Sequence, residues 1–286
     1  MKLAHVFLYI TFPFKVIAEC GEAVLADYWA DLMQQGVYPI EAVHMRMNDQ
    51  QRLQRMFHKR DLPDHRNSNL FHVSKSPDGG TSLEQLIMYS SLVTSLKNKA
   101  ASSNTPFTHM CESGLNAGVS ALSFLCGANG NTSTSNDVNR AGGNVSLTSF
   151  DLRANEVPEV ATRLLNRRYP NLHVAVFGSS LDTLPSKLYQ KGFICHFVSI
   201  DGGHIPSIVY SDFVHFHALS PHGTTVVIDN CNVNNLTHHF GGMKGVNAGY
   251  WQAQTHGLVR HVKQVMTGIC GGKDLTCREV CVGEFI

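Results

Sequence analysis

From Pro106 onward, short apolar runs rich in β-branched and aromatic residues alternate with segments whose apolar residues recur at helical spacing. A helix between successive strands is the connection that parallel strands require, so this alternation predicts an α/β fold. We expect a Rossmann-like, doubly wound sheet with helices on both faces. The expected strands cover residues 107–111, 145–150, 172–177, 193–200 and 224–229, and the helices between them begin near Ala117, Pro158, Leu184 and Pro206.

The segments before and after this alternation have different patterns. Helical spacing over residues 21–35, from Pro39, and from the capping box Thr81–Glu84 to about Lys99 predicts a helical N-terminal cap region over residues 19–105. A second domain is expected over residues 106–286, with a surface insertion at 127–144 that is rich in Gly, Asn, Ser and Thr. Its C-terminal part is expected to comprise a Gly/Asn-rich loop at 230–249, an apolar-periodic segment at 250–262, and an antiparallel edge pair at 264–270 and 280–286.

Composition excludes several classes of protein. Hydrophobic residues make up 43% of the 286 residues and charged residues 16%, which is typical of a chain with a buried core. The formal net charge of +1 lacks the basic surplus of a dedicated nucleic-acid binder. Eight cysteines are too few for a disulfide framework to replace a core, and Cys270, Cys277 and Cys281 lack the paired C-x-x-C spacing of a zinc site, so edge-strand cysteines or a disulfide are expected there.

The N-terminus has the features of a secretory signal peptide. Lys2 precedes an apolar run over residues 6–14, and Val16 and Ala18 are small residues suited to a cleavage site after residue 18. The alternative is that residues 3–18 form a strand or buried helix; no other apolar run approaches the length of a membrane span. Three N-x-S/T triplets would carry glycans in the secretory pathway, at Asn131, Asn144 and Asn235. We therefore expect a secreted or secretory-pathway protein, with a cytoplasmic location as the alternative.

Acidic side chains follow four of the five expected strands. Ligands of open parallel sheets bind at the carboxyl ends of the strands, so these residues are candidates for one site. Glu112 is followed by Gly114 and Gly118, which let the backbone approach a nucleoside closely, and Asp151 could bind a ribose diol. The P-loop, G-x-G-x-x-G and G-x-S-x-G motifs are missing, which disfavours P-loop nucleotide binding, a nicotinamide oxidoreductase and a serine hydrolase. Taken singly, each acid is more often a helix cap or turn residue.

A possible metal site follows the last two of these strands. Asp201, Asp229 and Asn230 offer hard oxygen ligands from adjacent positions in the sheet, a set that suits Mg²⁺. The alternative is that Asp201 steers the substrate and no ion is needed.

Five segments together resemble a known family: H-M-C-E-S-G-L-N-A-G at 109–118, S-F-D-L at 149–152, F-G-S-S at 177–180, S-I-D-G-G-H at 199–204 and V-I-D-N at 227–230. They are similar to the class I S-adenosylmethionine-dependent methyltransferases, and most of all to the methyltransferase-24 branch, from about Pro106 to the C-terminus. The resemblance implies a seven-stranded sheet whose last strand is antiparallel. The long insertion stretches the usual spacing between Glu112 and Asp151.

The resemblance also implies a cofactor site for S-adenosylmethionine. Its methionine end would lie along Glu112, Gly114 and Gly118, and Asp151 would hold the ribose hydroxyls. Ser179 stands where the family often has an aspartate near the adenine, which makes that contact a departure from the pattern. The full set of cofactor-binding residues that we expect is Glu112, Ser113, Gly114, Asn116, Gly118, Asp151, Ser179 and Asp201.

The acids after the last two strands are similar to the metal site of catechol- and macrocin-type O-methyltransferases. In those enzymes the residue three beyond the first aspartate can act as a base, which makes His204 and Asp201 the expected catalytic pair. The alternative for His204 is a histidine bonded to backbone at a helix start. The predicted function is O-methylation of a hydroxyl on a small molecule or glycan, with S-adenosylmethionine and possible help from Mg²⁺. A non-catalytic binding protein on the same fold is the competing hypothesis.

Overall fold

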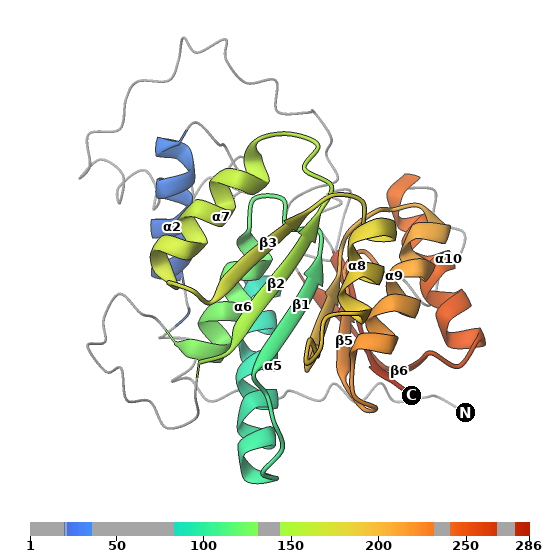
Figure 1. Ribbon diagram of the computed structural model, residues 1–286. Coiled ribbons are helices and arrows are strands. Elements are labelled where there is room, and N and C mark those ends of the chain that lie inside the picture. The colour runs from blue at the N-terminus through green and yellow to red at the C-terminus, as the bar shows by residue number, and fades with distance from the viewer. Residues whose placement is uncertain (1–19, 21, 36–82, 131–143, 232–240, 268–277) are drawn as a thin grey trace, which may run out of the picture.

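A computed structural model describes residues 20, 22–35, 83–130, 144–231, 241–267 and 278–286 (Figure 1). At its centre is a seven-stranded sheet with the order β3-β2-β1-β4-β5-β7-β6. Five strands are parallel, and β7 is antiparallel to both of its neighbours, β5 and β6. The predicted α/β fold with seven strands and an antiparallel last strand is therefore confirmed.

The strands lie close to the predicted positions. The parallel set is β1 (His109–Ser113), β2 (Ser146–Asp151), β3 (His173–Phe177), β4 (Phe197–Ile200) and β5 (Thr225–Ile228), followed by β6 (Val259–Thr267) and β7 (Arg278–Phe285). All four residues of β5 are buried, as expected of an inner strand with helices on both faces. The predicted antiparallel pair of C-terminal strands forms. Of these two strands, β6 lies at the edge of the sheet and β7 lies between β5 and β6.

Helices cover both faces of the sheet (Figure 1). One apolar core joins the sheet to α2 (Glu22–Gln34), α5 (Leu83–Ser102), α6 (Val119–Asn129) and α7 (Val157–Arg168). A second core joins it to α8 (Ser180–Leu188), α9 (Pro206–Leu219) and α10 (Gly241–Thr255). Neighbouring residues of one strand enter different cores, as Val227 and Ile228 do, because successive side chains of a strand point to opposite faces.

Two helices extend into segments that were predicted as loops. α6 continues through Gly127, which the predicted insertion included, because Gly127 packs directly against the backbone of Ser90 and its carbonyl accepts a 2.7 Å hydrogen bond from Thr94. α10 begins at Gly241 rather than near 250. The predicted segment 250–262 is not one element, because α10 ends at Thr255 and β6 begins at Val259.

Several predictions lie outside the described residues: the signal peptide at 1–18, the helix from Pro39, Thr81 of the capping box, and the triplets at Asn131 and Asn235. Asn144 is described and is exposed just before β2. Within the described part of the chain, no helix combines the length and the apolar character that a membrane crossing requires.

Among the described residues, three disulfides join elements that are distant in the sequence. Cys20–Cys126 links the segment before α2 to α6, Cys111–Cys195 links β1 to the segment before β4, and Cys231–Cys281 links the segment after β5 to β7. Every cysteine of the described ranges is paired; Cys270 and Cys277 lie outside them. The sequence predicted none of these pairings, although a disulfide was one expectation for Cys281.

Candidate active site

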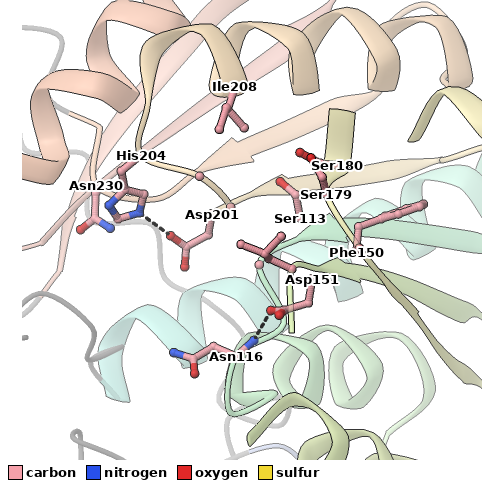
Figure 2. A pocket seen from close by; sticks show the side chains of 15 residues that line it. Ser113, Asn116, Phe150, Asp151, Ser179, Ser180, Asp201, His204, Ile208 and Asn230 are labelled. Atoms are coloured by element: carbon pink, nitrogen blue, oxygen red, sulfur yellow. Dashed lines mark hydrogen bonds and ion pairs between the residues drawn. The ribbon is translucent and has the colours of Figure 1, made fainter. Parts of the chain in front are cut away.

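A cavity of about 380 Å³ opens where the parallel strands end, beside the point at which the strand order reverses between β1 and β4 (Figure 2). It collects eight of the predicted site residues: Ser113, Gly114, Asn116, Asp151, Ser179, Asp201, His204 and Asn230. Glu112, Gly118 and Asp229 are not among the residues that line it. The other lining residues are Phe150, Leu152, Gly178, Ser180, Gly202, Gly203 and Ile208.

Gly114 shapes the turn that follows β1. Its φ of +92° is a conformation that favours glycine, and its N–H donates a 2.8 Å hydrogen bond to the carbonyl of Phe150. A Cβ at this position would collide with the backbone carbonyl of Asp201. The turn can therefore lie against the end of β4 only with glycine here, and the cavity wall between them stays free of side chains.

Gly118 has a supporting role instead of the predicted place in the cavity. It precedes α6 with a φ of +72°, and a Cβ would lie 2.6 Å from the hydroxyl of Tyr28. That hydroxyl donates a 3.0 Å hydrogen bond to the carbonyl of Ala117. The absence of a side chain at Gly118 thus lets α2, from the N-terminal region, support the glycine-containing loop.

Asp151 lies at the end of β2 and holds two loops in place. Its Oδ2 accepts a 2.9 Å hydrogen bond from the backbone N–H of Asn116, and its Oδ1 accepts a 2.7 Å hydrogen bond from that of Arg153. A carboxylate has about four acceptor positions, so two remain for a ligand. Figure 2 shows Asp151 and Asn116 on the same side of the cavity. This geometry suits the predicted contact with a diol.

Glu112 lies beneath the cavity wall rather than on it. It is buried, and its carboxyl accepts hydrogen bonds from Ser149 at 2.6 Å and Ser120 at 3.0 Å. Burial raises the pKa of Glu112 to about 8, although the two hydroxyls oppose the shift. The Ser149 hydroxyl also lies 2.9 Å from Nε2 of His173. Glu112 therefore belongs to a buried polar network under β1 and β2.

Ser179 follows β3 and caps α8. Its hydroxyl accepts a hydrogen bond from the backbone N–H of Leu181 at 3.3 Å, and it lines the cavity together with its neighbour Ser180. Where the family often has an aspartate, this edge of the cavity therefore carries the short hydroxyls of Ser179 and Ser180.

Asp201 and His204 form a pair on the cavity wall (Figure 2). His204 Nε2 lies 3.6 Å from Asp201 Oδ1, and each side chain is about one-third exposed, at 33% and 35%. The backbone at His204 is fixed by α10, because a Cβ at Gly245 would overlap the carbonyl oxygen of His204. The two side chains are therefore accessible to a ligand, and close packing against Gly245 of α10 fixes the main chain at His204.

Asp229 and Asn230 differ in where their side chains lie. Asn230 lines the cavity, whereas Asp229 is 2% exposed. Oδ1 of Asp229 accepts a 2.6 Å hydrogen bond from Nε2 of Gln85 on α5, and its Oδ2 accepts one from Nδ2 of Asn230 at 3.3 Å. Because Asp229 is directed toward α5, the three predicted ligands do not fit Mg²⁺ in this arrangement.

The described ranges also contain no other candidate metal site. No group of three or more His, Cys, Asp and Glu side chains is placed there to hold an ion. The described residues therefore show no site for the Mg²⁺ ion that the sequence suggested.

Sequence reasoning missed the apolar and small residues of the cavity. Phe150 and Leu152 flank Asp151 on β2 and the loop after it, and Ile208 lies in the first turn of α9. The side chain of Leu152 is 68% exposed, and it forms part of the apolar lining of the cavity. Gly202 and Gly203 directly follow Asp201. The Asp-Gly-Gly-His motif was the sequence signal that could have placed these two glycines at the cavity.

Comparison with known proteins gives one family match. A family model described as a methyltransferase domain matches residues 111–231, which run from within β1 to just past β5 and contain every residue that lines the cavity. No curated protein matches the chain significantly.

Two solved structures share the fold at low sequence identity. The O-methyltransferase TomG from Streptomyces achromogenes, involved in tomaymycin synthesis and solved with S-adenosylmethionine, is 16% identical with a TM-score of 0.58, over 95% of this chain and 93% of TomG. An O-methyltransferase from Bacillus cereus, solved with S-adenosylhomocysteine, is 15% identical with a TM-score of 0.54, over 91% of this chain and 100% of that one. Residues 111–231 therefore match a methyltransferase domain, and the chain shares its fold with these two O-methyltransferases.

Proposed function

We propose that this protein is a methyltransferase that uses S-adenosylmethionine to methylate a hydroxyl oxygen of a small molecule or glycan, with His204 as the base. One observation carries the proposal: the Asp201–His204 pair lies on the wall of the same cavity that Gly114 and Asp151 shape. Residues that suit a nucleoside and a side chain that can accept a proton therefore lie around one cavity. The two similar O-methyltransferases support transfer to oxygen.

The cavity residues fit the cofactor. The wall without side chains at Gly114 would take the methionine part, Asp151 would accept from the ribose hydroxyls, and Leu152 and Ile208 would cover the flat adenine ring. Glu112 would act indirectly, through the network beneath β1. When bound, S-adenosylmethionine supplies an electrophilic methyl group on a positively charged sulfur. The residues of the chain then have to orient this group and the acceptor.

His204 would take the proton of the acceptor hydroxyl. Neutral imidazole is the ordinary side chain for this task near pH 7, and the carboxylate of Asp201 at 3.6 Å would stabilise the imidazolium that forms. Asn230, on the same wall, can donate and accept hydrogen bonds and would help to orient the acceptor. No step of this proposal uses a metal ion.

We also propose that the protein works in an oxidising compartment, as the signal-like N-terminus predicts. Disulfides persist in the secretory pathway and are rare in the cytosol, and all three connect elements of the folded chain. Two of them adjoin the site, since Cys111 precedes Glu112 and Cys231 follows Asn230. The exposed Asn144 offers a glycosylation site on the same chain.

Transfer of a labelled methyl group tests the proposed function. The oxidised protein is incubated with methyl-labelled S-adenosylmethionine and a panel of phenols, aliphatic alcohols and glycans, and methylated products are identified. We expect His204→Ala to lower the rate about 10²-fold without changing the affinity for S-adenosylhomocysteine. The matched control is His222→Ala, because His222 is exposed and does not line the cavity.

Two outcomes would contradict the proposal. Full activity of the His204→Ala variant would exclude His204 as the base. Tight cofactor binding with no transfer to any class of hydroxyl would favour the non-catalytic alternative.

A further inference from the structure

The loop that joins β1 to α6, at residues 114–118, is held from two sides. On one side, Asn116 lines the cavity and its backbone N–H donates to Asp151. On the other side, Ala117 is buried, and its carbonyl accepts the 3.0 Å hydrogen bond from Tyr28. Asn116 has a φ of +42°, a left-handed conformation that costs energy in a residue with a side chain and persists only where surrounding contacts hold it. The contacts on both sides therefore fix this part of the cavity wall.

Tyr28 reaches the loop from outside the part of the chain that matches a methyltransferase domain. It lies in α2, beside α7 (Figure 1), whereas the matched residues begin at 111. Its side chain is 1% exposed. A Cβ on Gly118 would lie 2.6 Å from its hydroxyl and 3.1 Å from Cδ1 of Leu165, so α2 and α7 both pack closely against the loop there. Tyr28 does not line the cavity, so its effect on a ligand has to pass through the backbone of Ala117.

The disulfide Cys20–Cys126 fixes α2 next to the same loop. Cys20 stands two residues before the start of α2, and Cys126 lies in α6, which begins directly after Gly118. The bond joins positions that are 106 residues apart in the sequence. The ion pair Arg167–Asp31 also joins α2 to α7, but Arg167 is 68% exposed, and exposed pairs contribute little to stability. The disulfide is therefore the covalent link that keeps α2 beside the loop.

Among the disulfides of the described ranges, Cys20–Cys126 is the most accessible, because Cys20 is partly exposed. The cysteines of the other two bonds are fully buried: Cys111, Cys195, Cys231 and Cys281. Thiol–disulfide exchange requires a thiolate to attack one sulfur directly, so access decides which bond is reduced first. A dithiol that reduces Cys20–Cys126 gives up two electrons and two protons and becomes a disulfide, while Cys20 and Cys126 become thiols. This bond can therefore be reduced before the others.

We propose that Tyr28 is a positioning residue for the loop at 114–118 and that the Cys20–Cys126 bond keeps it in place, so that reduction of this bond weakens cofactor binding. The inference rests on the proposed function, in which this loop borders the cofactor. Without the bond, α2 is free to move away from α6, and the carbonyl of Ala117 loses its donor. The cofactor then has to order the loop when it binds, which lowers its affinity.

Calorimetric titration with S-adenosylhomocysteine tests the role of Tyr28. We expect Tyr28→Phe to weaken binding about fivefold, the effect of one lost hydrogen bond, because this change removes the hydroxyl alone. Tyr169→Phe is the matched control. The buried hydroxyl of Tyr169 also donates to a backbone carbonyl, that of Gly130 at 3.3 Å, but Gly130 lies at the opposite end of α6 from the loop. Both variants should lose stability in urea, and only Tyr28→Phe should lose affinity.

A second comparison tests the disulfide. The wild-type chain is titrated before and after treatment with dithiothreitol, and peptide mapping of labelled thiols identifies the reduced pair. We expect reduction of Cys20–Cys126 to weaken binding about fivefold in the wild-type chain and not to weaken it further in Tyr28→Phe, because both changes remove the same contact. Cys20→Ser should bind like the reduced wild-type chain, with or without dithiothreitol. If Cys20→Ser fails to fold, the reduced wild-type chain and Tyr28→Phe decide the question.

Three outcomes would overturn the inference. Equal affinity of Tyr28→Phe and Tyr169→Phe would give Tyr28 a merely structural role. Unchanged binding after selective reduction of Cys20–Cys126 would show that the bond does not control the loop. In both cases, binding by the oxidised wild-type chain leaves the proposed function intact. If the oxidised wild-type chain does not bind S-adenosylhomocysteine, the proposed function and the inference both fail.

Discussion

The side-chain amide of Gln85 donates a 2.6 Å hydrogen bond to Oδ1 of Asp229, across 144 positions of sequence. Nε2 of Gln85 also lies 2.8 Å from the hydroxyl of Tyr89, so the contact belongs to a buried polar cluster on α5. It ties the helical N-terminal region to the end of β5. Asp229 thereby acts as a structural acceptor behind the cavity rather than as a ligand inside it.

This arrangement predicts methyl transfer without a divalent ion. Once an acceptor is known, we expect the rate in excess EDTA to stay within about twofold of the untreated rate, because Mg²⁺ needs oxygen ligands that face the cavity together. The measurement is product formation with EDTA and after addition of Mg²⁺. Loss of activity in EDTA and its recovery with Mg²⁺ would contradict this account and would restore Asp201, Asp229 and Asn230 as ligands.

Stability should fall between pH 6.5 and 8 because of Glu112. Burial raises its pKa from 4.5 to about 8, so the folded chain holds a proton that the unfolded chain has released. The stabilisation present below pH 4.5 is lost as the pH rises through about 8, by up to about 1.4 kcal/mol per pH unit. The pKa values of His109 and His173 are lowered to about 4, so these groups titrate below this window in the folded chain.

Glu112→Gln should flatten this slope, as measured by urea unfolding at several pH values. Glu156→Gln is the matched control, because Glu156 is exposed. The same slope in the Glu112→Gln variant as in the wild-type protein would show that another group is responsible.

The sequence predicted the sheet because its signals are local. Apolar runs mark β2, β3 and β5 within one or two residues of the observed bounds, and Pro206 marks the start of α9. The missed start of α10 has a different cause. Its glycines have low intrinsic helix propensity, but Gly245 and Gly249 allow close packing against His204 and Val209, and such a tertiary contact has no local signal.

Predicted site residues that directly follow a strand line the cavity, whereas others are kept from it by the direction of their side chains. Asp151 and Asp201 line the cavity because they stand at strand ends. Glu112 was expected beside them, but it faces Ser149 and Ser120 inside the domain. The role of Asp229 depends on Gln85, a residue of the N-terminal region whose proximity no spacing rule indicates.

The protein should lose residues 1–18 and carry a glycan on Asn144 when it is made in a eukaryotic secretory host. The apolar N-terminal run and the exposure of Asn144 support this expectation. N-terminal sequencing checks the first part, and the mobility shift after enzymatic deglycosylation checks the second. Asn144→Gln should remove one glycan and leave the other triplets unaffected. Retention of Met1 or Lys2, or an unglycosylated Asn144, would argue for the cytoplasmic alternative.

Titration of S-adenosylmethionine into the oxidised wild-type chain and into its Asp151→Ala variant tests the central claim most directly, namely that the cavity between Asp151 and His204 holds the cofactor. We predict saturable binding to the wild-type chain and a loss of about 1 to 3 kcal/mol in the variant, because the ribose loses a charged acceptor. Asp182→Ala, a change at an exposed acid of α8, should have no effect. Unchanged affinity in Asp151→Ala, or no binding to the wild-type chain, would contradict the assignment of this cavity to S-adenosylmethionine.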